Sequence, residues 1–178
     1  MLEVRFHGRG GHGVVTAAEL LAIAAFHDGR HAQAFPMFGS ERTGAPVVAY
    51  CRVSDRPIRS HDPVVEPDAV VVGDPTLLAL PEVTSGLRPD GFFVVNASAV
   101  PDGLASQLPA GHAAAVPATW IALHHLGRPL PHAALLARLV ALTGVVTVTS
   151  LMQSFEERFS VDVARANALC VAEVLASA

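Results

Sequence analysis

The feature that most constrains this chain is a glycine-rich turn near its start, between a strand-like run and a helix-like run. After the turn, Leu20, Leu21, Ile23, Ala24 and Phe26 have the three- and four-residue spacing of a helix. The first N–H groups of such a helix have no intrahelical acceptor and carry partial positive charge. Glycine also lets an anion approach the backbone closely. We therefore expect a phosphate or carboxylate site, formed by Gly8, Arg9, Gly10, Gly11, His12, Gly13 and Thr16.

The same turn matches the dinucleotide fingerprint Gly8-x-Gly10-x-x-Gly13. That fingerprint also needs an acidic residue about 20 positions later, at the end of the second strand, to hold a ribose. Residues 30–36 contain no Asp or Glu, which argues against a free-standing dinucleotide-binding reductase. A turn that only lets strand and helix pack tightly is a further alternative.

The composition favours one compact domain spanning residues 1–178. The chain is 51% hydrophobic and 16% charged, which suits a buried core. A net charge of −4 gives no field that would attract nucleic acid or a membrane. No signal-peptide layout and no apolar run of about 18 residues is present, so we expect a cytoplasmic protein. Two cysteines, Cys51 and Cys170, cannot hold an iron–sulfur cluster alone.

The remaining pattern predicts an α/β fold, with a three-layer, mostly parallel Rossmann-like sheet flanked by helices and a helical C-terminal third. Strands are expected at 31–35, 47–53, 68–72, 91–98 and 112–116, and a short helix from Pro75. The later helices are expected at 118–126, at 131–142, after a capping box Ser150-x-x-Gln153, and at 160–176. In the final helix, Val163, Ala164, Leu169, Val171, Ala172 and Val174 are expected toward the core. These helices would cover the sheet or dock another subunit.

Three polar residues stand where predicted strands end: Asp74, Asn96 and Ser98. Such ends line the ligand crevice of open α/β sheets. Each residue could equally cap a helix or form a turn. We take Asn96 as a further candidate for cofactor binding.

An unusual loop lies between Pro36 and Pro46, with aromatic and charged residues close together. Apolar residues in a loop usually dock on something. We expect an interface or ligand loop formed by Phe35, Phe38, Gly39, Ser40, Glu41 and Arg42.

The nine histidines raise the question of a metal site. His124 and His125 are adjacent, which should point them to different sides of a helix, and no His-x-x-x-His pair has a carboxylate partner. We predict neither a metal site nor a catalytic residue in this chain.

Several segments together resemble the γ subunit of the 2-oxoacid:ferredoxin oxidoreductases, especially that of pyruvate synthase. The most specific are the opening through Glu19 and the run Ala34-Phe35-Pro36-x-Phe38-Gly39-x-Glu41-Arg42-x-Gly44-Ala45-Pro46-Val47. Others are Glu66-Pro67-Asp68-x-Val70-Val71-Val72, Val116-Pro117-Ala118-Thr119, Leu126-Gly127-Arg128-Pro129, Leu142-Thr143-Gly144 and Glu157-Arg158-Phe159. The departures are His12, where the family usually has Gln, and Ser40 and Thr43.

The resemblance implies a subunit of a heteromeric enzyme that decarboxylates a 2-oxoacid with thiamine diphosphate and Mg²⁺. Electrons would pass through 4Fe-4S clusters to ferredoxin, and the product would be an acyl-CoA. The thiamine and cluster sites would lie on the α, β and δ subunits, or on their fused counterparts. This chain would complete the assembly and help place CoA, although a purely structural role is also open.

Overall fold

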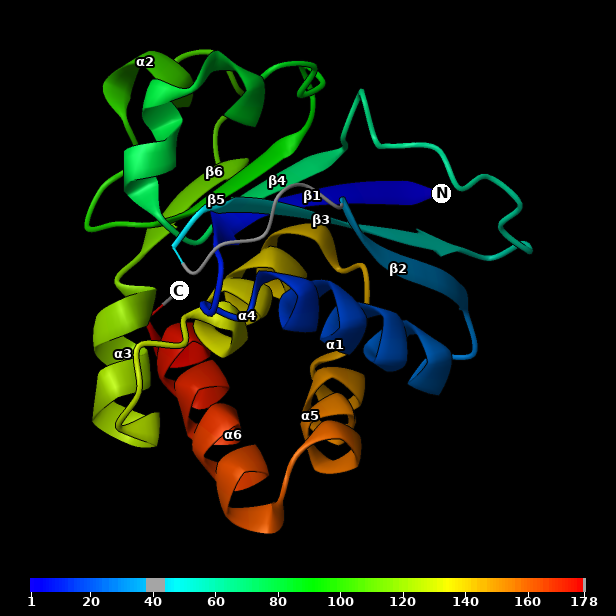
Figure 1. Ribbon diagram of the computed structural model, residues 1–178, viewed down its shortest axis with the longest axis vertical. Helices are drawn as coiled ribbons and strands as arrows, with labels where there is room; N and C mark the ends of the chain where they lie inside the picture. The colour runs from blue at the N-terminus through cyan, green and yellow to red at the C-terminus, as the bar shows by residue number, and fades with distance from the viewer. Residues whose placement is uncertain (38–43, 178) are drawn as a thin grey trace.

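The computed structural model describes residues 1–37 and 44–177, which build one six-stranded sheet with helices packed on it (Figure 1). The strand order is β2-β3-β1-β4-β5-β6. The strands are β1 (Leu2–Arg9), β2 (His31–Met37), β3 (Pro46–Ser54), β4 (Ala69–Val72), β5 (Phe92–Asn96) and β6 (Ala113–Val116).

The sheet is parallel on one side of β1 and antiparallel on the other. β1, β4, β5 and β6 pair in parallel, whereas β3 runs antiparallel to both β1 and β2. The predicted α/β fold with a mostly parallel sheet is confirmed, and the antiparallel pair is the difference. A parallel crossover needs about a dozen residues or more. The connection between Met37 and Pro46 is shorter, so these strands form a hairpin.

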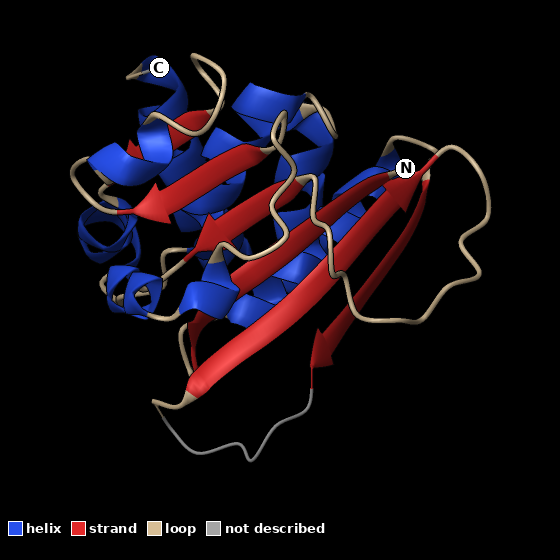
Figure 2. Cartoon of the chain, turned by 90° about the horizontal axis from the view of Figure 1, so that it is seen from above, coloured by secondary structure: helices blue, strands red, loops and turns tan. Residues whose placement is uncertain are grey.

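Most helices lie on one face of the sheet (Figures 1 and 2). Helices α1 (Val14–His27) and α4 (His132–Thr143) lie against it, and behind them are α3 (Ala118–Leu126), α5 (Val148–Arg158) and α6 (Val161–Ala176). The main core lies between these helices and the sheet; Val4, Phe6, Leu20, Leu136 and Phe155 are among its buried residues.

The opposite face is covered in two ways. Over β4 and β5, the short helices η1 (Pro75–Ala79), η2 (Pro81–Val83) and α2 (Asp102–Ala105) belong to a thinner layer with its own small apolar core. Over β1 and β3, Arg5 and Arg52 bind backbone carbonyls of the loops and of η2. Arg5 donates to the carbonyls of residues 64, 82, 83 and 85, and Arg52 to those of residues 60 and 62. These cations are structural, because backbone acceptors occupy them.

Glycines follow the C-termini of three helices, as predicted. Gly29, Gly127 and Gly144 all have positive φ and follow the C-termini of α1, α3 and α4, as expected for left-handed caps. The predicted capping box at Ser150 is wrong. Thr147 is the N-cap of α5 and its hydroxyl accepts from the Ser150 N–H at 3.1 Å.

Helix α6 buries a different stripe from the predicted one. Ala164, Val171 and Val174 are buried as expected, but Val163, Leu169 and Ala172 are exposed. Asn167 and Cys170 take positions on the buried face instead. Among the described residues, no helix combines the length and apolarity that a membrane crossing requires.

Candidate functional site

The turn between β1 and α1 requires glycine at two positions. A Cβ on Gly8 would lie 2.5 Å from Val14 Cγ2, so the strand and the helix pack closely only without it. Gly13 has φ +76°, and a Cβ there would lie 2.9 Å from His132 Nδ1. Gly11 also has positive φ, but the space beside it is open. The turn therefore has packed glycines at its ends and an open one between them.

The N-terminus of α1 lacks an internal cap. Gly13 is its N-cap residue, and no side chain of the described part of the chain caps this helix end. The first intrahelical bond of the helix runs from Ala17 N to Gly13 O at 2.9 Å. The N–H groups of Val14, Val15 and Thr16 precede it and point along the helix axis, where the dipole favours an anion. This geometry is that of an anion-binding turn.

These donors face a cavity of about 610 Å³. It is lined by the predicted residues Arg9, Gly10, Gly11, Gly13 and Thr16, together with Val14, Val15, Val47, Arg128, Leu130, His132 and Phe159. Two cations and the helix N-terminus therefore share a wall with apolar side chains. Such a cavity suits a ligand with an anionic part and an apolar part.

Arg9 mainly stabilises the turn, because its guanidinium contacts three other residues. Its Nε pairs with the Asp74 carboxylate, Nη2 donates to Thr76 Oγ1 at 2.7 Å, and Nη1 donates to the Gly44 carbonyl at 3.1 Å. Partial burial raises the pKa of Asp74. Hydrogen bonds from Thr76 and the nearby Arg9 outweigh that effect, so the pKa is lowered and the carboxylate stays charged. The Asp74 carboxylate also accepts a hydrogen bond from Thr76 N and so caps η1. Of the roles that the sequence left open for Asp74, helix capping is the one that the structure shows.

Arg128 was missed as a candidate, although it stands in the Leu126-Gly127-Arg128-Pro129 segment of the resemblance. It lines the cavity and is exposed. No carboxylate of the described residues lies within ion-pair distance of it. Arg128 is therefore better placed than Arg9 to bind a ligand anion.

His132 is the second missed residue, and no sequence signal marked it. It begins α4, is 4% exposed and lines the cavity against Gly13. Within the described residues, neither ring nitrogen makes a hydrogen bond of normal geometry, although the Asn167 side chain lies close enough to interact with the ring. Burial lowers the pKa of His132 to about 4, and the nearby Asn167 offsets this only in part. The neutral imidazole is therefore a polar group without a well-formed hydrogen bond in the cavity wall, and its two nitrogens are buried.

The structure does not bring Gly8, His12 and Asn96 to this cavity. His12 lines a separate space of about 20 Å³ with His7 and His132, which suits about one water molecule. Asn96 joins strand ends to α3: its amide donates to Gly73 O and Thr119 Oγ1, and its oxygen accepts from Thr119 N at 3.1 Å. Asn96 therefore caps α3, one of the alternatives that the sequence left open.

The predicted interface loop falls mostly outside the described residues, which omit Phe38, Gly39, Ser40, Glu41 and Arg42. Phe35 lies in β2, where its ring centroid is 5.2 Å from that of Tyr50 and 5.3 Å from the Arg52 guanidinium carbon.

The sheet topology gives a second argument against a dinucleotide-binding reductase. The strand beside β1 on that side is the antiparallel β3, whereas a Rossmann unit has the parallel strand that follows the first helix.

Fold and cavity together define an α/β protein with an uncapped helix N-terminus and an open cavity at a strand–turn–helix junction. A family model described as "Pyruvate ferredoxin/flavodoxin oxidoreductase" matches residues 3–176. The chain is 45% identical over 175 residues to the "Pyruvate/ketoisovalerate oxidoreductases common subunit gamma" of Thermococcus kodakarensis, covering 97% of this chain and 95% of that protein. It is 46% identical over 159 residues to the "Pyruvate synthase subunit PorC" of Methanothermobacter marburgensis, covering 89% and 87%.

A solved structure agrees with these similarities. The pyruvate oxidoreductase subunit PorC of Thermotoga maritima is 36% identical, with a TM-score of 0.83, over 97% of this chain and 94% of that one. The chain therefore belongs to the pyruvate ferredoxin/flavodoxin oxidoreductase family, as an enzyme subunit of the gamma type.

Proposed function

We propose that this chain is the gamma subunit of a complex that oxidatively decarboxylates a 2-oxoacid, most simply pyruvate, to an acyl-CoA and reduces ferredoxin. Within that complex it acts as one α/β unit of residues 1–178. The names of its relatives support pyruvate as the substrate. The partners would be α, β and δ subunits or fused equivalents, assembled in the cytoplasm.

The chain would bind CoA through the cavity at the glycine turn. The observation that carries this proposal is the uncapped N-terminus of α1, which opens on a cavity with an exposed arginine. The phosphates of CoA would accept from the N–H groups of Val14–Thr16 and from Arg128. The apolar wall of Val15, Leu130 and Phe159 would contact the uncharged part of the molecule. CoA supplies the thiol that accepts the acyl group; this chain positions that ligand.

The thiamine diphosphate, Mg²⁺ and 4Fe-4S clusters are proposed to lie on the partner subunits. The two cysteines here are both fully buried, on β3 and α6. Burial raises the pKa of each thiol, which favours the protonated form rather than the thiolate that ligates iron. Cys51 and Cys170 are suited to packing.

Arg128→Ala tests this function in the assembled complex. Because a charge-assisted hydrogen bond contributes about 1.5–3 kcal/mol, we expect the KM for CoA to rise about tenfold or more. The KM for pantetheine, a thiol acceptor without phosphate, should not change. Arg165→Ala is the matched control, since Arg165 is an exposed arginine on α6 that does not line the cavity. Equal KM changes for both acceptors would show that Arg128 acts on folding or assembly instead.

A further inference from the structure

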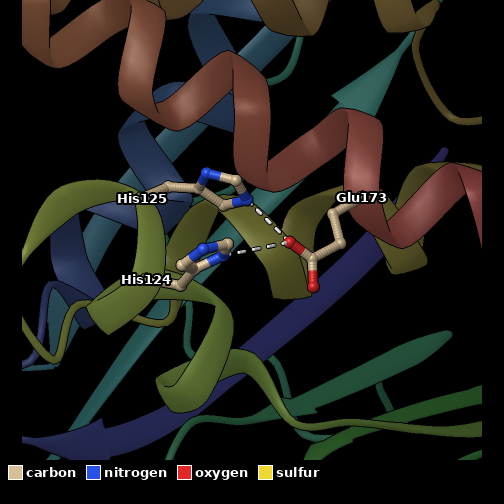
Figure 3. Close-up of side chains that lie close together, drawn as sticks. All are labelled: His124, His125 and Glu173. Carbon is tan, nitrogen blue, oxygen red and sulfur yellow. Dashed lines mark hydrogen bonds and ion pairs between the residues drawn. The ribbon is translucent and has the colours of Figure 1, made fainter.

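Two histidines of α3 and a glutamate of α6 meet on the surface where these helices pack together (Figure 3). His125 Nε2 lies 2.6 Å from Glu173 Oε2, and His124 Nδ1 lies 3.8 Å from the same oxygen. One nitrogen from each ring and one carboxylate oxygen all lie within 4.8 Å of one another. None of the three residues lines the cavity at the glycine turn.

The convergence corrects the expectation that His124 and His125 point to different sides of α3. Adjacent helix positions diverge by about 100°, yet both rings reach one carboxylate. They do so because His125 uses its far nitrogen and His124 its near one, and the Glu173 carboxylate lies beside both rings (Figure 3). The two ring centroids are 4.6 Å apart.

We propose that His124, His125 and Glu173 bind a divalent transition-metal ion of the zinc class. Imidazole nitrogen and carboxylate oxygen are ligands of Zn²⁺, at about 2.0–2.2 Å. Imidazole also favours Zn²⁺, Cu²⁺ and Ni²⁺ over Mg²⁺ and Ca²⁺. Three protein ligands leave a fourth position for water, as in open zinc sites.

The distances are close to those that an ion needs. Ligand atoms around a tetrahedral ion lie roughly 3.3 Å apart, given metal–ligand bonds of about 2.0–2.1 Å. The observed separations of 2.6 and 3.8 Å from the Glu173 oxygen bracket that value. The two histidine nitrogens lie within 4.8 Å of each other, so side-chain rotations would complete the ligand set. The ion would take the place of the hydrogen bond between His125 and Glu173.

Exposure and charge also suit an ion. The His124 side chain is 62% exposed, which gives access from solvent, whereas the His125 and Glu173 side chains are 18% and 32% exposed. The Glu173 carboxylate offsets part of the ion's charge. A bound ion joins the last turn of α3 to α6 at a point where two helices from the C-terminal third meet.

The same chain contains an ordinary pair for comparison. His27 Nε2 lies 3.1 Å from Glu157 Oε2, also between two helices, α1 and α5. Among the described residues, it has no third ligand within the distance that defines the cluster. If a simple histidine–glutamate pair were enough to bind the ion, the two places would behave alike.

A single tryptophan makes the test direct. Trp120 is the one tryptophan of the chain, and its ring centroid lies 5.6 Å from that of His124. We would titrate the full chain with Zn²⁺ by calorimetry and with Co²⁺ by quenching of Trp120 fluorescence. The expected result is one ion per chain with a Kd of about 10 µM or lower, and Co²⁺ quenching that excess Zn²⁺ reverses.

The variants are His124→Ala, His125→Ala and Glu173→Gln, with His27→Ala as the control. Each of the first three should weaken Zn²⁺ binding about tenfold or more, and His27→Ala should leave it unchanged. Circular dichroism and thermal melting without metal confirm that each variant is folded; if His125→Ala does not fold, Glu173→Gln and the more exposed His124→Ala provide the comparison. No saturable binding up to about 100 µM Zn²⁺, or equal loss in His27→Ala, would overturn the proposal.

Discussion

Helices α1 and α5 begin in opposite ways. At α5, the Thr147 hydroxyl accepts from Ser150 N, and the Asp28 carboxylate accepts from Thr147 N at 2.7 Å, from Thr147 Oγ1 at 2.8 Å and from Ser150 Oγ at 2.5 Å. At α1, Gly13 offers no side chain, and the first turn faces a cavity. One helix start has an internal anion and the other, within the described residues, has none.

The difference separates structure from function. Both helix ends have unpaired N–H groups and a dipole that favours negative oxygen. At α5, Asp28 supplies the negative oxygen that these groups favour. Burial raises the pKa of Asp28, but hydrogen bonds from Ser150 and Thr147 and the nearby Arg30 lower it more, so the carboxylate stays charged. At α1, the first N–H groups have no side-chain acceptor among the described residues and are open to a ligand. The ring nitrogens of His132, beside this turn, also lack a hydrogen-bond partner of normal geometry. We expect unpaired polar groups to mark the binding site and paired ones to stabilise the fold.

The largest expected effect concerns His132 in acid. Its pKa is about 4 when folded and about 6.5 when unfolded. The unfolded chain therefore binds more protons between these values, so stability is complete above pH 6.5 and is lost as pH falls toward 4. The loss from His132 should reach roughly 3 kcal/mol by pH 4, since one pKa unit is 1.36 kcal/mol.

His132→Leu isolates that contribution. Denaturant unfolding at several pH values should give a flatter pH dependence for the variant than for the native chain. His7 has a pKa of about 4 through burial and the nearby Arg5, and it remains in both proteins, so part of the acid loss should persist. Parallel pH profiles would mean that a partner already satisfies the His132 ring.

The next effect tests the shape of the α1 start. Gly13→Ala adds a Cβ at φ +76°, 2.9 Å from His132 Nδ1, and should cost about 2–3 kcal/mol of unfolding free energy through strain and overpacking. Gly29→Ala is the control, because it has φ +71° with open space around it and should show the strain alone. An equal loss of unfolding free energy in both variants, measured by thermal or denaturant unfolding, would show that the Cβ at residue 13 does not clash with His132.

A smaller effect tests the internal anion at α5. Asp28→Ala removes the acceptor of three hydrogen bonds, and we expect a loss of about 1–2 kcal/mol, as for a helix cap. Asp55→Ala removes a carboxylate that is 82% exposed and pairs with Arg30, and should cost under about 1 kcal/mol. The KM for CoA should not change in either variant, because neither residue lines the cavity. A raised KM for CoA in Asp28→Ala would show that the N-terminus of α5 also affects CoA binding, which would contradict the contrast between the two helices.

The sequence was sufficient for features that depend on neighbouring residues. The apolar runs around Val70 and Val94 predicted buried parallel strands, and Gly127 and Gly144 predicted helix ends, because burial and left-handed caps leave local signals. The glycine turn predicted an anion site for the same reason. Five of its seven residues line the cavity, and the binding role itself stays a prediction.

The rest depends on contacts between distant segments. Asp28 caps a helix that begins at Val148, and Asn96 caps α3 from the end of a strand. No local pattern reports such pairs. His132 looks like an ordinary polar residue at the start of an apolar helix, and only the packing against Gly13 shows that it is buried without a well-formed hydrogen bond. Glu173 likewise joins His124 and His125 only in three dimensions.

The most direct test of the central claim is the KM for CoA of the assembled enzyme with Gly11→Asp. Gly11 has φ +88° and open space beside it, and Gly111 matches it with φ +83° and open space elsewhere. A carboxylate at residue 11 should occupy the anion site at the start of α1, so we predict a rise of about tenfold or more, or about 1.4 kcal/mol, with Gly111→Asp unchanged. An unchanged KM in an intact Gly11→Asp complex, or equal rises in both variants, would contradict a CoA site at this turn.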